Sequence, residues 1–304
     1  MNIPNIAIIG GSGLRQIEEA KLTFQYCIKT PYGDPSSPAY QMRFTDLPAD
    51  SPEFLFLHRH GAGHAIPPHQ INELANFFAL MREQIDIVFN FTAVGALTDV
   101  PVKLNVGDFA LVTKVVDQTG PRTGKTFFQN GWSGHYPTEH VGCAYLTRVF
   151  VEACEKLGFP YHLNKTCVAI EGPQFANSAE LKLYRWLGCD LIGMTQIPFA
   201  KLAIESNICV LIIAMVTDDA TENTLVTGEL VERRMKEISA KAAALIKQMM
   251  GSKLMAEYAE SMAIGCVSCV HGPESIVTDE KLWTDHHRKL FELMFRRRKN
   301  MQYK

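Results

Sequence analysis

Uninterrupted runs of apolar residues alternate along this chain with segments in which apolar residues recur every three or four positions. Short apolar runs bounded by polar residues are typical of strands that are buried on both faces of a sheet. The runs expected to form such strands are Ile6–Ile9, Phe54–Leu57, Ile87–Phe91, Phe109–Val112, Val168–Ile170, Leu191–Met194 and Cys209–Val216.

The segments between several of these runs have the spacing of amphipathic helices. They are Asn72–Glu83, Leu146–Leu157 and Ser178–Leu187. A strand followed by a helix, repeated along the chain, predicts an α/β fold with a mostly parallel, twisted central sheet flanked by helices. No Pro-, Gly- or Ser-rich linker precedes residue 250, so we expect one domain over residues 1–250 and a C-terminal extension, largely helical, over residues 251–304.

Within the extension, Thr284–Phe295 has apolar residues on one helical face, ahead of the basic run Arg296–Lys299. This pattern favours a terminal helix that packs on the body of the protein and ends in a solvated basic segment. A helix that binds a membrane surface or a partner protein is the alternative.

The composition excludes several classes of protein. The 304 residues are 47% hydrophobic and 20% charged with a formal net charge of −2, which gives no sign of a surface that binds nucleic acid. No apolar stretch approaches the roughly 18 residues of a membrane span, and the N-terminus lacks the layout of a secretory signal. We therefore expect a cytoplasmic protein without a membrane span.

Eight cysteines are scattered through apolar surroundings, which favours buried free thiols over a disulfide framework in a chain of this length. Only Cys266 and Cys269, with His271 just beyond, have the spacing of a metal-binding motif. A metal site would need a second pair of ligands, and none stands out along the sequence. We therefore predict ordinary buried thiols and no metal site.

Polar residues follow directly after several of the expected strands. The first strand runs into a glycine-rich turn, Gly10–Gly13, that contains Ser12, and the second runs into Arg59 and His60. Backbone amides, a hydroxyl, a guanidinium and an imidazole at strand ends suit a phosphate dianion. Ligands of open α/β sheets bind at this edge. Metal binding or loop packing is the alternative for the histidine cluster.

Further strand ends carry Thr92 and Thr195, whose hydroxyls complete a set that would surround one tetrahedral anion. The remaining strands end near Phe175 and Asp218. Phe175 offers a flat face for a heteroaromatic ring, and a buried Asp218 can share a proton with ring nitrogens. Asp219 is adjacent to Asp218, and since neighbouring strand residues point in opposite directions, at most one of the two readily serves a shared ligand.

The order of these motifs resembles the methylthioadenosine phosphorylase branch of the trimeric purine nucleoside phosphorylases, over about residues 5 to 250. The segments that carry the resemblance are IIGGSGL, HRHGAGH, TAVGAL, EGPQF, GMTQIP and AMVTDD. Any one of them is a weak signal, whereas six in the family's order are a strong one.

The resemblance implies a role for each matching residue. Phosphate would be held by Ser12, Arg59, His60, Thr92, Ala93 and Thr195. Met194 would lie against the ribose and Phe175 against the purine, Val231 would also contact the substrate, and Asp218 would recognise the base. His135 would reach into the site of a neighbouring subunit, which makes a homotrimer the expected assembly.

The chain also departs from the family pattern. The family's aminopurine branch usually reads Asp-x-Asp, whereas this chain reads Asp218-Asp219-Ala220, so the second carboxylate that faces the base is lost or displaced. Other departures are Gln174 in place of Arg, Ala176 in place of a hydroxyl residue, Phe199 in place of Glu, and Glu232 near a 5' pocket that is mostly apolar in methylthio-specific relatives.

The implied reaction is phosphorolysis of a purine nucleoside, and S-methyl-5'-thioadenosine is the first candidate substrate. Phosphate captures C1' of the sugar while Asp218 bears or relays a proton at N7 of the departing purine. Inorganic phosphate is a co-substrate, and no metal ion or organic cofactor is required. Two alternatives are phosphorolysis of a 6-oxopurine nucleoside such as S-methyl-5'-thioinosine, and a non-catalytic nucleoside-binding protein.

Overall fold

The computed structural model describes residues 5–296 apart from 13, 15–16, 49–50, 98–103, 121–123, 221–226, 262–265, 267–268 and 270. Nine strands in this part of the chain form one sheet. They are β1 (Ile6–Gly10), β2 (Ala20–Tyr26), β3 (Ala39–Phe44), β4 (Phe54–His58), β5 (Ile87–Ala96), β6 (Phe109–Gln118), β7 (Tyr161–Ile170), β8 (Leu191–Gly193) and β9 (Cys209–Asp219).

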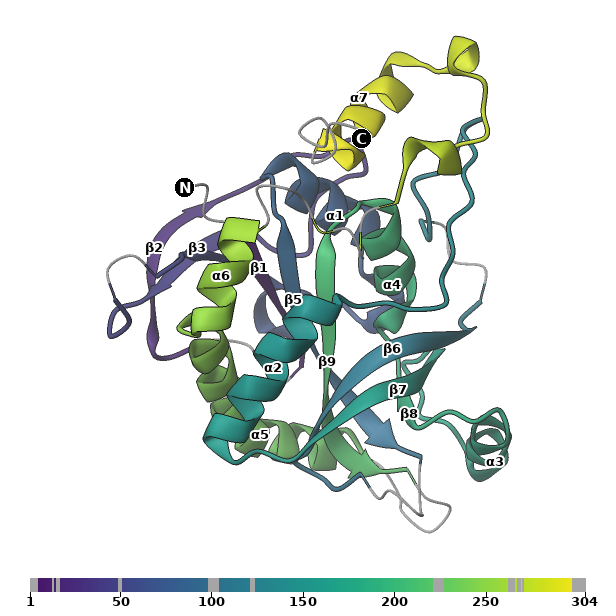
Figure 1. Ribbon diagram of the computed structural model, residues 1–304. Coiled ribbons are helices and arrows are strands. Elements are labelled where there is room, and N and C mark those ends of the chain that lie inside the picture. Colours follow the sequence, from purple (N-terminus) through teal and green to yellow (C-terminus); the bar gives the residue numbers. More distant parts are fainter. Residues whose placement is uncertain are drawn as a thin grey trace.

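The strands follow the order β2-β3-β4-β1-β5-β8-β7-β6-β9, and β9 also pairs with β5. The second half of the sheet therefore closes on itself, as Figure 1 shows around β5, β6, β7, β8 and β9. The pairs β1–β4, β1–β5, β5–β9, β6–β7 and β7–β8 are parallel. The predicted α/β fold is confirmed, with antiparallel pairs at β2–β3, β3–β4, β5–β8 and β6–β9.

All seven expected strands are present, whereas β2 and β3 were not predicted. The two lie at the edge of the sheet, and side chains of β2 such as Leu22 and Phe24 are exposed. An edge strand with a polar, half-solvated sequence lacks the continuous apolar run by which a buried strand is found.

Helices cover both faces of the sheet (Figure 1). On one face α1 (Glu73–Arg82), α4 (Gln196–Glu205) and α7 (Asp285–Met294) share a core. On the other face α2 (Ala144–Leu157), α5 (Gly228–Met250) and α6 (Lys253–Ser261) form a second core. Helix α3 (Ser178–Trp186) packs beside β7 and β8. Short 3-10 turns lie at Ala62–His64, Pro68–Gln70, Pro273–Ser275 and Glu280–Leu282.

The predicted helices begin and end within two residues of their expected positions because the sequence supplies caps. The side chain of Asn72 accepts a hydrogen bond from the Ala75 amide at the start of α1, and Asn177 caps α3 in the same way. Helix α2 ends at Gly158, whose left-handed conformation is accessible to glycine without strain.

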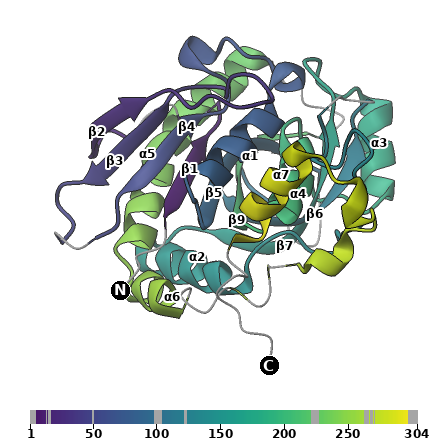
Figure 2. The same cartoon turned by 90° about the horizontal axis from the view of Figure 1, so that it is seen from above.

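The C-terminal helix α7 packs on the body, as predicted, with Leu290 and Met294 buried. Seen from above, it lies across α1 and α4 (Figure 2). Arg296 corrects the expectation of a fully solvated basic end, because its guanidinium contacts Asp86 at 3.2 Å and the Ile85 carbonyl at 2.6 Å. Residues 297–299 lie outside the described part of the chain. Among the described helices, none combines the length and apolarity that a membrane crossing requires.

Candidate functional site

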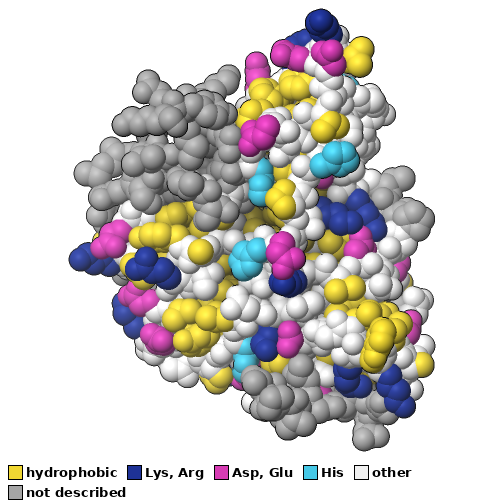
Figure 3. All heavy atoms as spheres, turned by 45° about the vertical axis from the view of Figure 1, so that its right-hand side comes forward, with side chains coloured by type: hydrophobic (Ala, Val, Ile, Leu, Met, Phe, Trp, Pro, Cys, Tyr) yellow, Lys and Arg dark blue, Asp and Glu magenta, His cyan; other side chains and the backbone are white. Residues whose placement is uncertain are grey.

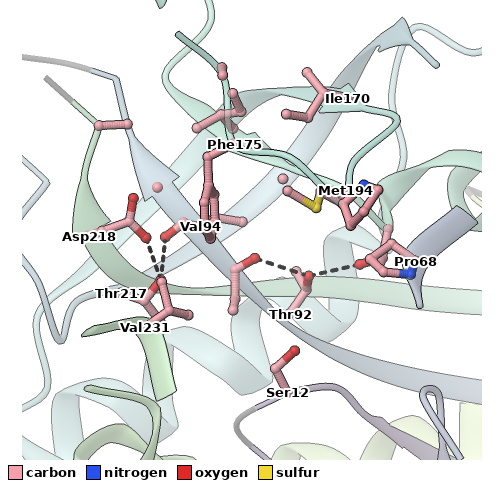
Figure 4. A pocket seen from close by; sticks show the side chains of 18 of the residues that line it. Ser12, Pro68, Thr92, Val94, Ile170, Phe175, Met194, Thr217, Asp218 and Val231 are labelled. Carbon is pink, nitrogen blue, oxygen red and sulfur yellow. Dashed lines mark hydrogen bonds between the residues drawn. The ribbon is translucent and has the colours of Figure 1, made fainter. Parts of the chain in front are cut away.

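A cavity of about 640 Å³ opens at the carboxyl ends of β1, β4, β5, β8 and β9 (Figure 4). Its size suits a nucleoside-sized ligand. The predicted site residues that line it are Ser12, Arg59, His60, Thr92, Ala93, Phe175, Met194, Thr195, Asp218 and Val231. Strand ends that are distant in the sequence are thus brought to one place, as the sequence predicted.

Arg59 is the buried cation of the cavity. Its Nη1 donates to Oδ1 of Asn90 at 2.6 Å and its Nη2 donates to the Phe91 carbonyl at 2.8 Å, whereas its Nε has no hydrogen-bond partner among the described residues. Burial lowers the pKa of Arg59 to about 10, so the guanidinium stays charged at neutral pH. A buried cation with a donor to spare favours binding of an anion at this end of the cavity.

Gly11 makes room for this guanidinium. A Cβ atom on Gly11 would lie 1.8 Å from Nη2 of Arg59, which is closer than any real contact. The backbone amide of Arg59 also donates to the Gly10 carbonyl at 3.0 Å, which fixes the end of β4 beside the end of β1. Gly11 in the glycine-rich turn therefore leaves the space that the Arg59 guanidinium occupies.

His60 has a defined tautomer. Its Nδ1 lies 2.8 Å from the Ile66 carbonyl oxygen, and a carbonyl oxygen only accepts, so Nδ1 carries a proton. The His64 ring stacks on it with centroids 4.1 Å apart. Because Nδ1 is committed to a carbonyl, Nε2 is the nitrogen that can contact a ligand, and it donates to an anion only when the ring is protonated.

The hydroxyls of Thr92 and Thr195 meet at the floor of the cavity. Their Oγ1 atoms are 3.1 Å apart, and Nε2 of Gln196 donates to Thr92 at 3.1 Å. Both threonines are buried. Figure 4 shows Ser12 on the same side of the cavity as Thr92. These hydroxyls and Arg59 form the polar end of the site.

Asp218 lies at the opposite side of the cavity in Figure 4, near Phe175. The Thr217 hydroxyl is 2.7 Å from Oδ1 of Asp218 and 3.2 Å from the Val94 carbonyl oxygen. Burial raises the pKa of Asp218, while the Thr217 hydroxyl and the Arg234 charge act in the opposite direction. A carboxyl group whose pKa is raised holds a proton more readily, which is useful in a group that donates to a leaving base.

Apolar side chains form the remaining wall. Phe175, Met194, Ile170 and Val231 are seen around the cavity in Figure 4. Phe175 is 47% exposed in the single chain, so it stands at the mouth of the cavity. This wall offers a flat aromatic face and a region without hydrogen-bonding groups.

The structure separates the family departures into those that face the cavity and those that do not. Ala220 and Ala176 line it, whereas Asp219 does not, in agreement with the alternation expected along β9. Phe199 is instead buried against Phe77, with ring centroids 5.0 Å apart. Gln174 is exposed and does not line the cavity.

Glu232 corrects one expectation. It was placed near the pocket for the 5' substituent, but its side chain is 55% exposed and faces Lys236, with the two charged groups 3.9 Å apart. Val231, one position earlier on α5, lines the cavity instead. The wall at this point is therefore apolar.

His135 does not line the cavity of its own chain. Its side chain is exposed, and its backbone amide donates to the Ser275 carbonyl at 2.8 Å. Its assignment to a neighbouring subunit's site stays a prediction.

Sequence reasoning assigned no role to Asn90 and Gln196, and it gave Gly11 a place in the glycine-rich turn without its contact with Arg59. Asn90 holds Arg59, Gln196 holds Thr92, and Gly11 leaves space for the guanidinium. Asn90 is a buried polar residue within β5, and Gln196 is the first residue of α4. A polar residue at a buried strand position is the signal by which Asn90 is found, since such a group needs a partner.

Comparison with known proteins places these features in context. The family model described as the phosphorylase superfamily matches residues 5–250. The S-methyl-5'-thioadenosine phosphorylase of Hyperthermus butylicus is 37% identical over 250 residues, covering 81% of this chain and 87% of that protein. The 6-oxopurine nucleoside phosphorylase of Pyrococcus furiosus is 36% identical over 245 residues, covering 77% and 88%.

The fold is also similar to that of a solved structure. A methylthioadenosine phosphorylase from an antarctic soil metagenomic library matches with a TM-score of 0.82 and 28% identity, covering 97% of this chain and 99% of that one.

Proposed function

Since the chain belongs to the phosphorylase superfamily, we propose that it cleaves S-methyl-5'-thioadenosine with inorganic phosphate, giving adenine and S-methyl-5-thioribose 1-phosphate. The observation that carries this proposal is the division of one cavity into a cationic, hydroxyl-lined end at Arg59 and a carboxyl-bearing end at Asp218. The enzyme is a pentosyltransferase. Phosphate occupies the first end and the purine the second, with the sugar between them.

The mechanism follows from this division. Arg59, Ser12, Thr92 and Thr195 hold phosphate below C1' of the sugar, where it captures the carbon as the glycosidic bond lengthens. Negative charge develops on the departing purine, and Asp218 stabilises it by sharing a proton with N7. The burial that raises the pKa of Asp218 thus favours the form of the carboxyl group that the reaction needs.

The apolar wall supports a methylthio group at the 5' position. Val231 lines the cavity with an apolar side chain, and Glu232 faces solvent. A thioether has no proton to donate, so it loses little when it leaves water for such a surface.

A second candidate is a 6-oxopurine nucleoside, for which the observation is the pair Ala176 and Ala220 in the cavity wall. Neither side chain can hydrogen-bond the base, so Asp218 is the one polar group left among the positions assigned to base recognition. A site loses selectivity when it lacks buried groups that the wrong substrate would leave unpaired. We therefore expect a modest preference for the 6-amino over the 6-oxo compound.

The test is incubation of the purified protein with S-methyl-5'-thioadenosine or S-methyl-5'-thioinosine, with and without phosphate, while the free base is measured. We expect phosphate-dependent release of adenine at the higher kcat/KM. A strong preference for the inosine compound would promote the second candidate and overturn the assignment of Asp218. Binding of both nucleosides without release of base would leave only a nucleoside-binding protein.

The proposed assembly is a homotrimer in which His135 contributes to a neighbouring site. Exposed apolar side chains support an interface beside the cavity: on and next to α3, Trp186 is 82% exposed and Leu183 and Leu187 are also exposed. Figure 3 shows hydrophobic side chains reaching this side of the surface in clusters between charged groups. Sedimentation at assay concentrations tests the assembly, since a fully active monomer is incompatible with a shared site.

A further inference from the structure

Four cysteines from three separate segments meet on the side of the sheet that α2, α5 and α6 cover. They are Cys143 before α2, Cys209 at the start of β9, and Cys266 and Cys269 in the turn after α6. Their Sγ atoms all lie within 4.8 Å of one another, and those of Cys143 and Cys266 are 3.7 Å apart. The second ligand pair that the sequence did not reveal is thus available from Cys143 and Cys209.

The spacing suits a single tetrahedral ion. Four thiolates at the Zn–S distance of about 2.3 Å from a common centre are about 3.8 Å apart along each edge of the tetrahedron. The observed separations reach that geometry with shifts of less than about 1 Å. Clusters with several iron atoms would hold thiolates on different irons farther apart, so one ion with four sulfur ligands fits best.

Main-chain hydrogen bonds connect the segments that carry the cysteines. The amide of Cys269 donates to the Cys266 carbonyl at 3.4 Å, which closes the turn between these two cysteines. The amide of Cys143 donates to the Val210 carbonyl at 3.0 Å, which fixes the start of α2 beside the start of β9. The four sulfurs are therefore held together by main-chain contacts of three elements.

Neighbouring groups stabilise negative charge on the cysteine sulfurs. The buried hydroxyl of Tyr258 donates to Sγ of Cys209 at 3.0 Å and lies 3.5 Å from Sγ of Cys143. Cys143 also stands at the N-terminus of α2, where the helix dipole favours a thiolate. Four thiolates around a divalent cation carry a net charge of −2, which these donors offset.

We propose that Cys143, Cys209, Cys266 and Cys269 bind one structural zinc ion that fastens the C-terminal extension to the catalytic domain. The family match ends at residue 250, so two of the ligands belong to the matched region and two to the extension beyond it. All four positions are filled by protein, which is typical of a structural rather than a catalytic zinc.

The test begins with the full-length protein purified without nickel resin or chelator. We expect about one zinc per chain by mass spectrometry of metals, and X-ray absorption showing four sulfur ligands at about 2.3 Å. Zinc well below one-fifth of an equivalent, nitrogen or oxygen ligands, iron in place of zinc, or a disulfide between any two of these cysteines in fresh protein would each overturn the proposal.

Variants provide the second arm. Cys209→Ser should lower the zinc content at least ten-fold, whereas Cys154→Ser, the same change at a buried cysteine outside the cluster, should leave it unchanged. Tyr258→Phe should retain one zinc with affinity about ten-fold weaker, because the hydroxyl donates to a ligand sulfur. If Cys209→Ser fails to fold, the proposal is tested by adding Co²⁺ to demetallated wild-type protein. One equivalent of Co²⁺ must then give the absorption spectrum of a tetrahedral site with four thiolate ligands.

Discussion

The two ends of strand β9 are both buried and both meet polar or polarisable groups, yet they are built for different tasks. Asp218, near the carboxyl end, faces a cavity of about 640 Å³. Cys209, at the opposite end roughly 30 Å away along the strand, meets three other thiols within 4.8 Å. One end surrounds space for two substrates, whereas the other leaves room for no more than an ion.

The difference shows how the same scaffold separates catalysis from attachment. At the carboxyl end of β9, the cavity is lined by donors such as Arg59. Neighbours such as Asn90 hold these donors and orient them before a ligand arrives. At the amino end of β9, the four cysteine sulfurs face one another rather than an open cavity. An ion bound there would stabilise the fold instead of taking part in a reaction. Substitutions at the first end should change turnover, and those at the second should change stability.

The largest effect is expected for Arg59→Ala. The change removes several charge-assisted hydrogen bonds to phosphate, so kcat/KM for phosphate should fall by about 100- to 1,000-fold. Arg59→Lys keeps the charge without the fork of donors and should lose about ten-fold. Initial rates against phosphate concentration provide the measurement, and normal saturation of the alanine variant would refute the anion site.

A somewhat smaller loss is expected for Asp218→Asn. Because an amide cannot carry the proton for N7, kcat/KM for S-methyl-5'-thioadenosine should fall by about 100-fold, and less for the inosine analogue, whose O6 accepts from the amide. Wild-type activity should decline as pH rises through the raised pKa of Asp218, and the variant should lack this decline.

Asp219→Asn is the control for that variant, because Asp219 is adjacent in sequence but does not line the cavity. It should change either kcat/KM by less than about three-fold, as expected for a surface substitution away from bound groups. An equal loss in both variants would mean that the cavity side of β9 has been misassigned.

Gly11→Ala should reduce kcat/KM for phosphate by about ten-fold or more, because the added methyl group occupies the position of the Arg59 guanidinium. The matched control is Gly228→Ala, where nothing lies within 4 Å of the added Cβ atom. Steady-state kinetics with circular dichroism separates displacement of Arg59 from unfolding. Equal kcat/KM for phosphate in the two variants would show that Gly11 is needed only for the backbone turn and does not position Arg59.

The smallest effect on turnover is expected at the other end of β9. Cys266→Ser removes one sulfur of the cluster and should cost about 3 kcal/mol of stability, which is roughly 5–10 °C in Tm. Well below that temperature, kcat/KM should stay within about two-fold of wild type. Scanning calorimetry and kinetics at 25 °C are the measurements, and a large loss of turnover without a loss of stability would contradict the separation of the two ends.

Much of the fold was predictable because its strands are buried on both faces. The expected strands are mostly continuous apolar runs, as in Phe54–Leu57, and Ile87–Phe91 is interrupted only by Asn90. The prediction failed where burial is one-sided or partial: Leu22 and Phe24 in β2 are exposed, and the first residues of β7 from Tyr161 onward are polar and half-exposed. Such stretches are fixed by pairing with neighbours, which the sequence does not display.

The candidate site was largely predictable because parallel strands bring their carboxyl ends to one edge. Ser12, Arg59 and Asp218 belong to different strand ends and line one cavity. The cysteine cluster was not predictable, because Cys143 and Cys209 lie far from Cys266 in sequence and have no motif of their own. They come together through the packing of α2 against β9 and of α6 against α2.

Arg59 also bears on how this protein can evolve. The hydrogen-bond partners of Arg59 are the neutral Asn90 side chain and the Phe91 carbonyl, and the charge of the buried Glu73 also favours the charged guanidinium, so a bound phosphate would add to this stabilisation. Free phosphate should therefore protect the chain against unfolding as its concentration rises. In a lineage that no longer met this anion, selection would no longer retain the guanidinium, and drift toward an apolar side chain would be favoured.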